Sequence, residues 1–362
     1  MGNSTNNPNP VKSQVFSGMS FRSRLSWAIV LVVAIAVAGT AIYTFYRANV
    51  TNTLLTDRLA ESTLAQTENE LKSTTSLHAT ELNNYFESIN NNMATLGIAI
   101  QSLLAQETIL ETGHIWDARQ MLSRLPQGSW DNSNTEAGSV FVPVQDELPD
   151  TIISEINTLK QIDFTAPSVL KKNPDMVALY FGSREGETLY YPNIDLAAIL
   201  PADFDVSQRP WFVAAAPEQN PNQGVVWSVP YQDASLHGLV VTSSVPVYDL
   251  SSQFRGVLAA DLQLTKISNL VSSIRVAQTG YAFVLDKEGR IIAMPDTGYT
   301  DFGIKPEEIQ GDKALESILT KVPLVTFDIV SKMITSQSGI RTLSLNGVEK
   351  YVAYQPIQSV GY

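Results

Sequence analysis

The sequence contains no cysteine, and this absence already excludes several kinds of protein. Without thiols the chain can form no disulfide, no thiolate metal site and no cysteine nucleophile. Any folded domain must therefore be held together by its hydrophobic core. With 362 residues, of which 44% are hydrophobic and 17% charged, the chain is long enough for two modest globular domains.

The motifs of common enzyme classes are also missing. No G-x-S-x-G, H-E-x-x-H, P-loop or G-x-G-x-x-G pattern occurs, and there is no D-x-D-x-D-G calcium loop. The only histidines are His78, His114 and His237, and nothing recommends any of them for a Ser-His-Asp triad. We therefore expect no catalytic residue, no metal and no cofactor in this segment. An enzymatic output would have to lie in sequence beyond it.

Positive charge is scarce outside the first residues. Residues 1–24 carry Lys12, Arg22 and Arg24 and no acid. Within them, residues 1–20 are rich in Asn, Ser, Pro and Gly without periodicity, which predicts a disordered tail. The remaining 21 of the 24 basic residues stand against all 36 acidic ones, a net charge of −15. Such an acidic chain argues against nucleic acid as a partner.

A single long uncharged run, Leu25–Tyr46, predicts a membrane-spanning helix. At about 1.5 Å per residue it can cross a hydrocarbon core of roughly 30 Å. Trp27 near one end and Tyr43 and Tyr46 near the other suit the two membrane interfaces. A cleaved signal peptide would have a shorter apolar run followed by small residues, whereas this run ends in YTFYR. We therefore favour a retained transmembrane helix over residues 25–46.

The charge distribution predicts the orientation of this helix. Basic residues flank the cytoplasmic side of membrane proteins, so residues 1–24 are expected to be a cytoplasmic tail. Residues 47–362 are then extracytoplasmic, and a bacterial inner membrane is the natural setting for them.

After the anchor, residues 47–110 predict one long stalk helix. Between about residue 50 and residue 106 there is no proline, and glycine occurs only at Gly97. Apolar residues recur there in steps of four and three: Leu82, Phe86, Ile89, Met93, Leu96, Ile100 and Leu103. This seam indicates packing against a partner element, either the chain's own core or a second subunit, and we expect both in part. His78 falls in the seam, where a polar residue tolerated at a packing position is favoured over a pH switch or a ligand contact.

Strand patterns then occur twice along the chain. Runs at 176–191, 225–231, 238–248 and 256–264 predict one antiparallel set, with a helical patch before it around Ile152–Ile162. A hairpin over 281–295, a mainly helical stretch over 306–337 and two strands over 339–357 predict a second set. The similar hairpins SREGETLYYP and DKEGRIIAMP indicate an internal repeat. We therefore expect an α+β chain with units over 111–265 and 266–362, the second incomplete at Tyr362, and a second membrane span beyond it.

The stretch from Phe204 to Asp261 has the composition of a pocket for a small zwitterion. Arginine supplies a planar fork for a carboxylate, acids supply charge for a cation, and aromatic side chains supply rigid apolar walls. The candidate residues are Phe204, Arg209, Trp211, Phe212, Tyr231, Asp233 and Asp261, with Tyr180, Tyr190, Tyr191 and Trp227 as weaker candidates for the lining.

Each of these residues also has a structural interpretation. Arg209 could form an ion pair with Asp233 or Asp261, and Trp211 could be ordinary core. Asp261 follows the apolar run GVLAA, so it is costly to bury without a partner, either Arg209 or a ligand cation.

The chain resembles a bacterial double Cache sensory domain over roughly residues 25–362. The most specific matches are RPWF…PYQD…VVTSSVPVYD…GVLAADL and GYAFVLDKEGRIIAMPD. The resemblance implies two tandem PAS-like antiparallel sheets on one long helix, in a chemotaxis receptor, sensor kinase or cyclase. It further implies a small ligand in the membrane-distal unit, 111–265, and a signal passed inward.

One subset of that family recognises amino acids. By resemblance, Arg209 and Trp211 would hold the ligand carboxylate, while Tyr231, Asp233 and Asp261 would hold its ammonium group. Phe204 and Phe212 depart from that motif, because tyrosine is expected at both positions and each phenylalanine lacks the hydroxyl. The expected ligand is therefore an amino acid, an amine or an organic acid. The alternatives are an anchored structural or protein-interaction module without a small ligand, and an anchored exported enzyme.

Overall fold

The computed structural model describes residues 20–106, 116–305, 315–322, 324–335, 337–345 and 347–362. The predicted tail up to residue 19, the stalk beyond residue 106, His114 and the helical prediction over 306–314 lie outside the described residues. The chain divides into two compact units, Met1–Thr67 and Glu68–Tyr362, called unit 1 and unit 2 below.

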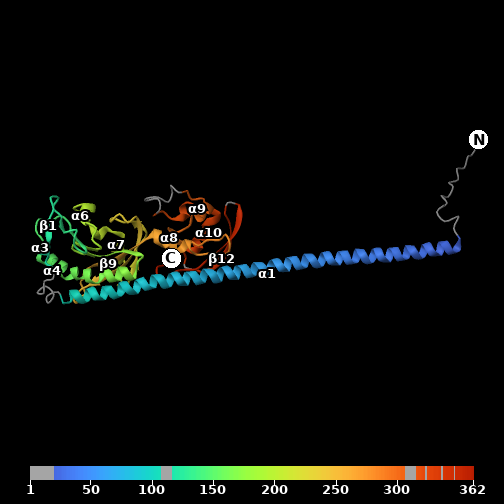
Figure 1. The fold of residues 1–362 in the computed structure, drawn as a ribbon, viewed down its shortest axis with the longest axis horizontal. Coiled ribbons are helices and arrows are strands. Elements are labelled where there is room, and N and C mark those ends of the chain that lie inside the picture. The colour runs from blue at the N-terminus through green and yellow to red at the C-terminus, as the bar shows by residue number, and fades with distance from the viewer. Residues whose placement is uncertain (1–19, 107–115, 306–314, 323, 336, 346) are drawn as a thin grey trace, which may run out of the picture. The chain divides into compact units, whose positions relative to one another are not determined.

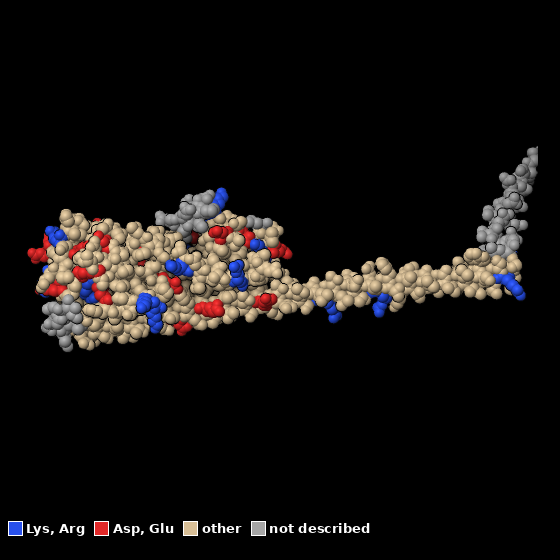
Figure 2. All heavy atoms as spheres, in the orientation of Figure 1, with Lys and Arg blue, Asp and Glu red and all other residues tan. Residues whose placement is uncertain are grey.

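Unit 1 consists, in its described part, of the first portion of helix α1 (Phe21–Leu104). The predicted span Leu25–Tyr46 lies within this helix, and every one of its side chains is exposed. On the face shown in Figure 2, no charged atoms appear between the basic side chains that flank this stretch. By length and composition α1 therefore contains one candidate membrane span.

In unit 2, α1 buries one stripe of its surface, as the heptad seam predicts. Phe86 and Met93 are almost completely buried, and each contributes about 1.5–3 kcal/mol by leaving water. Toward the end of α1 the buried positions are Gly97, Ile100 and Leu104. The predicted Leu96 and Leu103 are only half-buried. A straight helix with 3.6 residues per turn drifts from a 3.5-residue repeat, and the seam therefore shifts by one residue.

The other helices among the described residues are short and lie in unit 2. They are α3 (Ala118–Met121), α4 (Asp150–Leu159), η2 (Lys160–Phe164), α5 (Ala166–Lys172), α6 (Leu196–Ile199), η3 (Val206–Gln208), α7 (Pro210–Ala215), α8 (Leu264–Ser272), α9 (Asp296–Asp301), η6 (Ile318–Thr320) and α10 (Leu324–Met333). The predicted helical patch around Ile152–Ile162 is confirmed as α4 and η2. An acid in the first turn of α4 complements the positive end of the helix dipole.

Nine strands form one antiparallel sheet in the order β1-β2-β3-β5-β4-β9-β8-β6, with β7 also paired to β8. They are β1 (Leu122–Arg124), β2 (Trp130–Asn132), β3 (Ser139–Val142), β4 (Met176–Ser183), β5 (Thr188–Tyr191), β6 (Val226–Trp227), β7 (Tyr231–Gln232), β8 (Leu239–Tyr248) and β9 (Phe254–Gln263). The predicted strand at 225–231 is split into β6 and β7, because Pro230 between them has no N–H to donate to a ladder. Strands β1 to β3 were not predicted, since three or four residues between turns carry little pattern.

Both faces of this sheet are covered, and they have different roles. Leu179 and Phe181 of β4 point to the face that packs on α1 and α4. Ala178 and Tyr180 point to the other face, which packs on α6, η3 and α7. Side chains alternate between the faces of a strand, so Asp261 of β9, two residues beyond Ala259, also belongs to this second face.

The C-terminal part of unit 2 has two further two-stranded sheets. They are formed by β10 (Val284–Leu285) with β11 (Ile291–Ala293) and by β12 (Gly339–Leu345) with β13 (Val348–Tyr354). Figure 1 shows these elements, in orange and red, beside the large sheet and along α1. The α+β fold class with antiparallel sheets is confirmed, whereas the boundaries at residues 265 and 266 stay a prediction.

One junction joins α1, the large sheet and the C-terminal end of the chain. Trp227 of β6 donates a 2.8 Å hydrogen bond to Asn90 of α1, and Asn90 donates a 3.0 Å bond to the carbonyl of Ser359. The ring of Phe86 stands edge-on to Trp227 and to Tyr362. The two sheet regions are therefore tied to the same stretch of α1.

Candidate functional site

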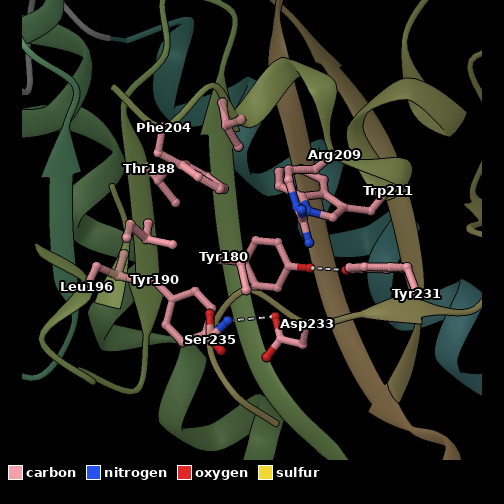
Figure 3. Close-up of a pocket in the computed structure, with 13 residues that line it drawn as sticks. Tyr180, Thr188, Tyr190, Leu196, Phe204, Arg209, Trp211, Tyr231, Asp233 and Ser235 are labelled. Carbon is pink, nitrogen blue, oxygen red and sulfur yellow. Dashed lines mark hydrogen bonds between the residues drawn. The ribbon is translucent and has the colours of Figure 1, made fainter. Parts of the chain in front are cut away.

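A small pocket opens on the second face of the large sheet (Figure 3). The space between its walls and across its open mouth is about 350 Å³, a figure that includes open solvent. Its lining consists of Tyr180, Thr188, Tyr190, Leu196, Leu200, Phe204, Val206, Arg209, Trp211, Tyr231, Asp233, Ala234 and Ser235.

Arg209 is held at the turn between η3 and α7. Asp205 caps η3 through the Ser207 N–H, and Pro210 begins α7, so the backbone at Arg209 is extended between two short helices. Its guanidinium group donates a 3.0 Å hydrogen bond to the carbonyl of Gln232. It also lies 5.4 Å from the centre of the Tyr231 ring.

The ion pair considered from the sequence is not seen. Among the described residues, no carboxylate lies within ion-pair distance of Arg209. Arginine stays charged at any ordinary pH, so a cation at the pocket wall keeps donors for an anionic group.

Trp211 lies so close to strand β4 that a side chain larger than glycine at residue 182 would collide with it. A Cβ at Gly182 of β4 would come within 2.6 Å of the Trp211 ring and 2.8 Å of Val206. Tyr180 meets the same indole edge-on at 4.9 Å. Trp211 is 4% exposed, so it belongs to the core and to the pocket wall at once.

Asp261 lies below the pocket wall, surrounded by hydroxyl groups. Its Oδ1 accepts hydrogen bonds from Tyr180 at 2.6 Å, from Thr242 at 2.6 Å and from Tyr231 at 3.3 Å. Its Oδ2 is buried and has no partner among the described residues. Burial, and secondarily the charge of Asp233, raises the pKa of Asp261 to about 7. The sequence indicated that Asp261 needs a partner, and the structure supplies hydroxyl groups in place of Arg209.

Asp233 begins the loop between β7 and β8. Its carboxylate accepts a 3.0 Å hydrogen bond from the N–H of Ser235 and lies 2.8 Å from Nδ1 of His237. The side chain is buried, yet it lines the pocket. In the view of Figure 3, Arg209 and Asp233 lie on opposite sides of the Tyr180 ring, so the pocket presents a positive and a negative end.

The two phenylalanines that depart from the amino-acid motif have different positions. Phe204 lines the pocket, and the Arg209 guanidinium lies 5.9 Å from its ring centre. Phe212 is 4% exposed and packs against Phe254 and Trp211, away from the lining. Only the missing hydroxyl of Phe204 therefore bears directly on a ligand.

Five of the seven candidate residues thus line one pocket, and the structure adds others that the sequence did not single out. Tyr180 and Tyr190, two of the weaker candidates, line it and stack on each other at 5.2 Å. Tyr191 and Trp227 are outside the lining. The residues missed are Thr188, Leu196, Leu200, Val206, Ala234 and Ser235. Strand alternation from Tyr190 could have indicated Thr188, but the helix and loop positions carry no such signal.

In the part of the chain that the structure describes, no three His, Asp or Glu side chains are grouped so that they could hold a metal ion. The polar groups of the pocket instead suit an organic molecule that carries both charges.

With the fold and pocket defined, the class of protein follows from comparison with known families. The chain belongs to the Cache domain family, whose double-Cache model matches residues 56–362.

Among curated relatives, methyl-accepting chemotaxis protein McpC of Bacillus subtilis is 32% identical over 170 residues, 47% of this chain and 24% of that protein. Methyl-accepting chemotaxis protein PscA of Pseudomonas syringae pv. tomato is 38% identical over 118 residues, 33% of this chain and 17% of that one. The chain therefore spans about a quarter or less of the length of these relatives.

Two solved structures show lower identity. The ligand-binding domain of the Pseudomonas aeruginosa chemoreceptor PctB with L-Gln is 20% identical, with a TM-score of 0.46, over 81% of this chain and 86% of that one. The Pseudomonas fluorescens chemoreceptor CtaA with L-isoleucine is 16% identical, with a TM-score of 0.47, over 83% and 90%.

Proposed function

We propose that this chain is the ligand-sensing part of a bacterial transmembrane receptor, and that its pocket binds a small amino acid. The observation that carries the proposal is Arg209, a cation at the pocket wall with no carboxylate partner among the described residues. A carboxylate ligand would supply that partner through two parallel N–H donors. Asp233, at the other end of the pocket, offers charge for an ammonium group.

The rest of the lining suggests the kind of side chain. Leu196, Leu200 and Val206 supply an apolar wall, and Phe204 extends it toward Arg209. We therefore expect aliphatic side chains of moderate size to be preferred over charged ones, because a second charge would be buried there without a partner. Similar domains support an amino acid, since the solved PctB and CtaA domains are complexes with L-Gln and L-isoleucine.

A thermal-shift screen of the purified chain against amino acids, amines and organic acids tests this function. A ligand at a hundred times its Kd adds about 2.7 kcal/mol to the free energy of unfolding, which gives a clear shift. The shift should disappear in Arg209→Ala and persist in Arg184→Ala, because Arg184 is an exposed arginine paired with Glu185. If no compound stabilises the chain, or if both variants respond like wild type, the pocket is not an amino-acid site.

The setting in the cell is part of the same proposal. The α1 stretch Leu25–Tyr46 would cross the inner membrane with residues 1–24 inside and residues 47–362 outside, as the basic residues near the N-terminus indicate. A reporter enzyme that is active only in the periplasm can be fused to either end of the chain. Activity of the N-terminal fusion would contradict this orientation.

A homodimer through α1 is favoured by a second stripe on that helix. Leu77, Asn84, Asn91 and Ile98 recur every seven residues on the side away from the core, and all are exposed. Leu77 and Ile98 are 57% and 63% exposed, which suits an apolar seam with asparagines that set the register. Cysteine introduced at Asn84 should form an inter-subunit crosslink, whereas cysteine at Thr165, away from α1, should not. If cysteines along the stripe form no crosslink, α1 packs only within its own chain and the proposed homodimer is wrong.

We further propose that ligand occupancy reaches α1 through the hydrogen bond from Trp227 to Asn90. Trp227 and Tyr231 lie on the two short strands that pair with β8, so a shift at the pocket can be passed along this edge. Spin labels on the α1 stripe should report a small change in inter-subunit distance on ligand addition. Identical distances with and without ligand would count against the coupling.

A further inference from the structure

The loop Asp233–Gly238 folds around its own first side chain. Asp233 N–H donates a 2.9 Å bond to the carbonyl of Gly238, which closes the hairpin between β7 and β8. The carboxylate accepts from the backbone N–H of Ser235 at 3.0 Å and of His237 at 3.2 Å. Nδ1 of the His237 ring lies 2.8 Å from Asp233 Oδ2. The pocket-lining carboxylate is therefore oriented by the far end of its own loop.

The carboxylate of Asp233 has an acceptor position that remains available for a ligand. Among the residues that the structure describes, Oδ2 of Asp233 faces two donors, the N–H and the ring of His237, while Oδ1 faces only the N–H of Ser235. Each carboxylate oxygen can accept about two hydrogen bonds, so Oδ1 keeps one acceptor position. The His237 side chain is 27% exposed, so solvent protons can reach its ring.

We propose that His237 is a positioning residue of the ligand pocket: it holds Asp233 in place, and its protonation weakens the binding of a ligand ammonium group. This inference rests on the proposed amino-acid function. A neutral ring that donates its N–H leaves the full charge of Asp233 for the ligand. A protonated ring forms an ion pair with the same carboxylate and competes with the ammonium group. Imidazole is the side chain whose charge ordinarily changes between about pH 5 and 8.

Other charged and titratable groups lie around the pair formed by Asp233 and His237. Arg209, on the turn before α7, contributes its guanidinium group to the pocket wall. Asp261 on β9 titrates near pH 7 and gains its charge as the pH rises, which also favours an ammonium ligand. The surrounding hydroxyls stay neutral, because burial raises their pKa values; they belong to Tyr180 on β4, Tyr190 on β5 and Tyr231 on β7. A variant of His237 is therefore needed to separate its contribution from that of Asp261.

The test is calorimetric titration of L-isoleucine into the whole chain in lipid nanodiscs at about pH 5.5 and about pH 7.5. The Kd of wild type should be roughly three- to tenfold higher at the lower pH because of His237. Any change that the titration of Asp261 causes adds to this ratio. His237→Gln keeps an N–H donor without a titrating charge, so its affinity at the higher pH should stay within about twofold of wild type and its loss in acid should be smaller. His78→Gln removes the same kind of side chain, paired with Glu81 on α1, and should behave as wild type.

The outcomes separate this inference from the proposed function. If wild type binds and His237→Gln keeps the full pH dependence, His237 does not modulate the pocket. If wild type does not bind L-isoleucine at either pH, the preference for an aliphatic amino acid fails.

Hydrogen exchange of the ligand-free chain then decides the positioning role by itself. His237→Ala should speed exchange of the Ser235 amide several-fold, because its acceptor Asp233 loses the ring partner. His78→Ala should leave that amide unchanged. Equal exchange in wild type and His237→Ala would overturn the positioning role.

Discussion

The hydroxyl of Tyr180 on β4 donates a 2.6 Å hydrogen bond to Oδ1 of Asp261 on the adjacent strand β9. Tyr180 lines the pocket, and Asp261 lies below it with its second oxygen unpartnered among the described residues. This short hydrogen bond therefore connects Tyr180 in the pocket wall to the buried carboxyl group of Asp261. The unused oxygen makes Asp261 costly to ionise in the free protein, and the same charge is what an ammonium ligand requires.

Asp261 should make the free chain less stable at alkaline pH. Burial raises its pKa to about 7, above the ordinary value of 3.8, so folding takes up a proton between those values. Its favourable contribution is present below about pH 4 and is lost as the pH rises through about 7. Asp261→Asn keeps the shape and the acceptor oxygen, so its free energy of unfolding at about pH 8 should exceed that of wild type by about 2–4 kcal/mol.

Chemical denaturation of unit 2 across pH measures this difference. The gap between Asp261→Asn and wild type should shrink as the pH falls from about 8 to about 5, since Asp261 is then protonated in the folded chain, and it should level off only below about pH 4, where the unfolded chain is protonated as well. Asp146→Asn is the control, because Asp146 is fully exposed. A gap that does not depend on pH would mean that Asp261 does not titrate in this range.

Gly182 should resist substitution by alanine. The added methyl group would meet the Trp211 ring at 2.6 Å, so the indole must move or the strand must shift. Overpacking of this kind costs about 1–3 kcal/mol, and it should also weaken ligand binding by displacing a pocket wall. Gly224→Ala is the matched change, because nothing lies within 4 Å of its added Cβ. Equal melting temperatures for the two variants would contradict the close approach.

The two phenylalanines should respond differently to a restored hydroxyl. Phe204→Tyr places a hydroxyl group in the lined pocket and should be tolerated, with a change in ligand affinity. Phe212→Tyr places it in a core of aromatic rings, where an unpaired hydroxyl costs about 1–3 kcal/mol. Melting curves with and without L-isoleucine distinguish the two effects. Similar stability losses in both variants would show that Phe204 also packs without access to the pocket.

Replacing Arg209 by lysine should show whether the planar fork is needed. Lysine keeps the charge but offers no parallel pair of donors, so affinity for a carboxylate ligand should fall roughly tenfold or more. The contacts with Gln232 and the Tyr231 ring are lost as well. Calorimetry on Arg209→Lys beside Arg184→Lys measures the effect, and unchanged binding in the first variant would move the anion site elsewhere.

Much of the architecture could be predicted because it depends on local pattern. The uncharged run Leu25–Tyr46, the apolar seam of α1 and the alternating strands β4, β8 and β9 are all visible within short windows of sequence. The shift of the seam to Gly97 could not be read from that repeat, because it depends on the straightness of the helix and on Val245 of β8 beside it.

The sequence by itself determined the candidate membrane span, the α+β class and the set of candidate pocket residues, with Arg209 as its arginine and Asp233 and Asp261 as its acids. Only the tertiary structure decided which of these residues line the pocket, which are buried in the core and which contact one another. Among the described residues it placed no acid at ion-pair distance from Arg209. It surrounded Asp261 with hydroxyl groups, packed Phe212 into the core and brought His237 to Asp233. These relations join strands and loops far apart in the chain, and register and side-chain direction, which no local window contains, determine which atoms meet.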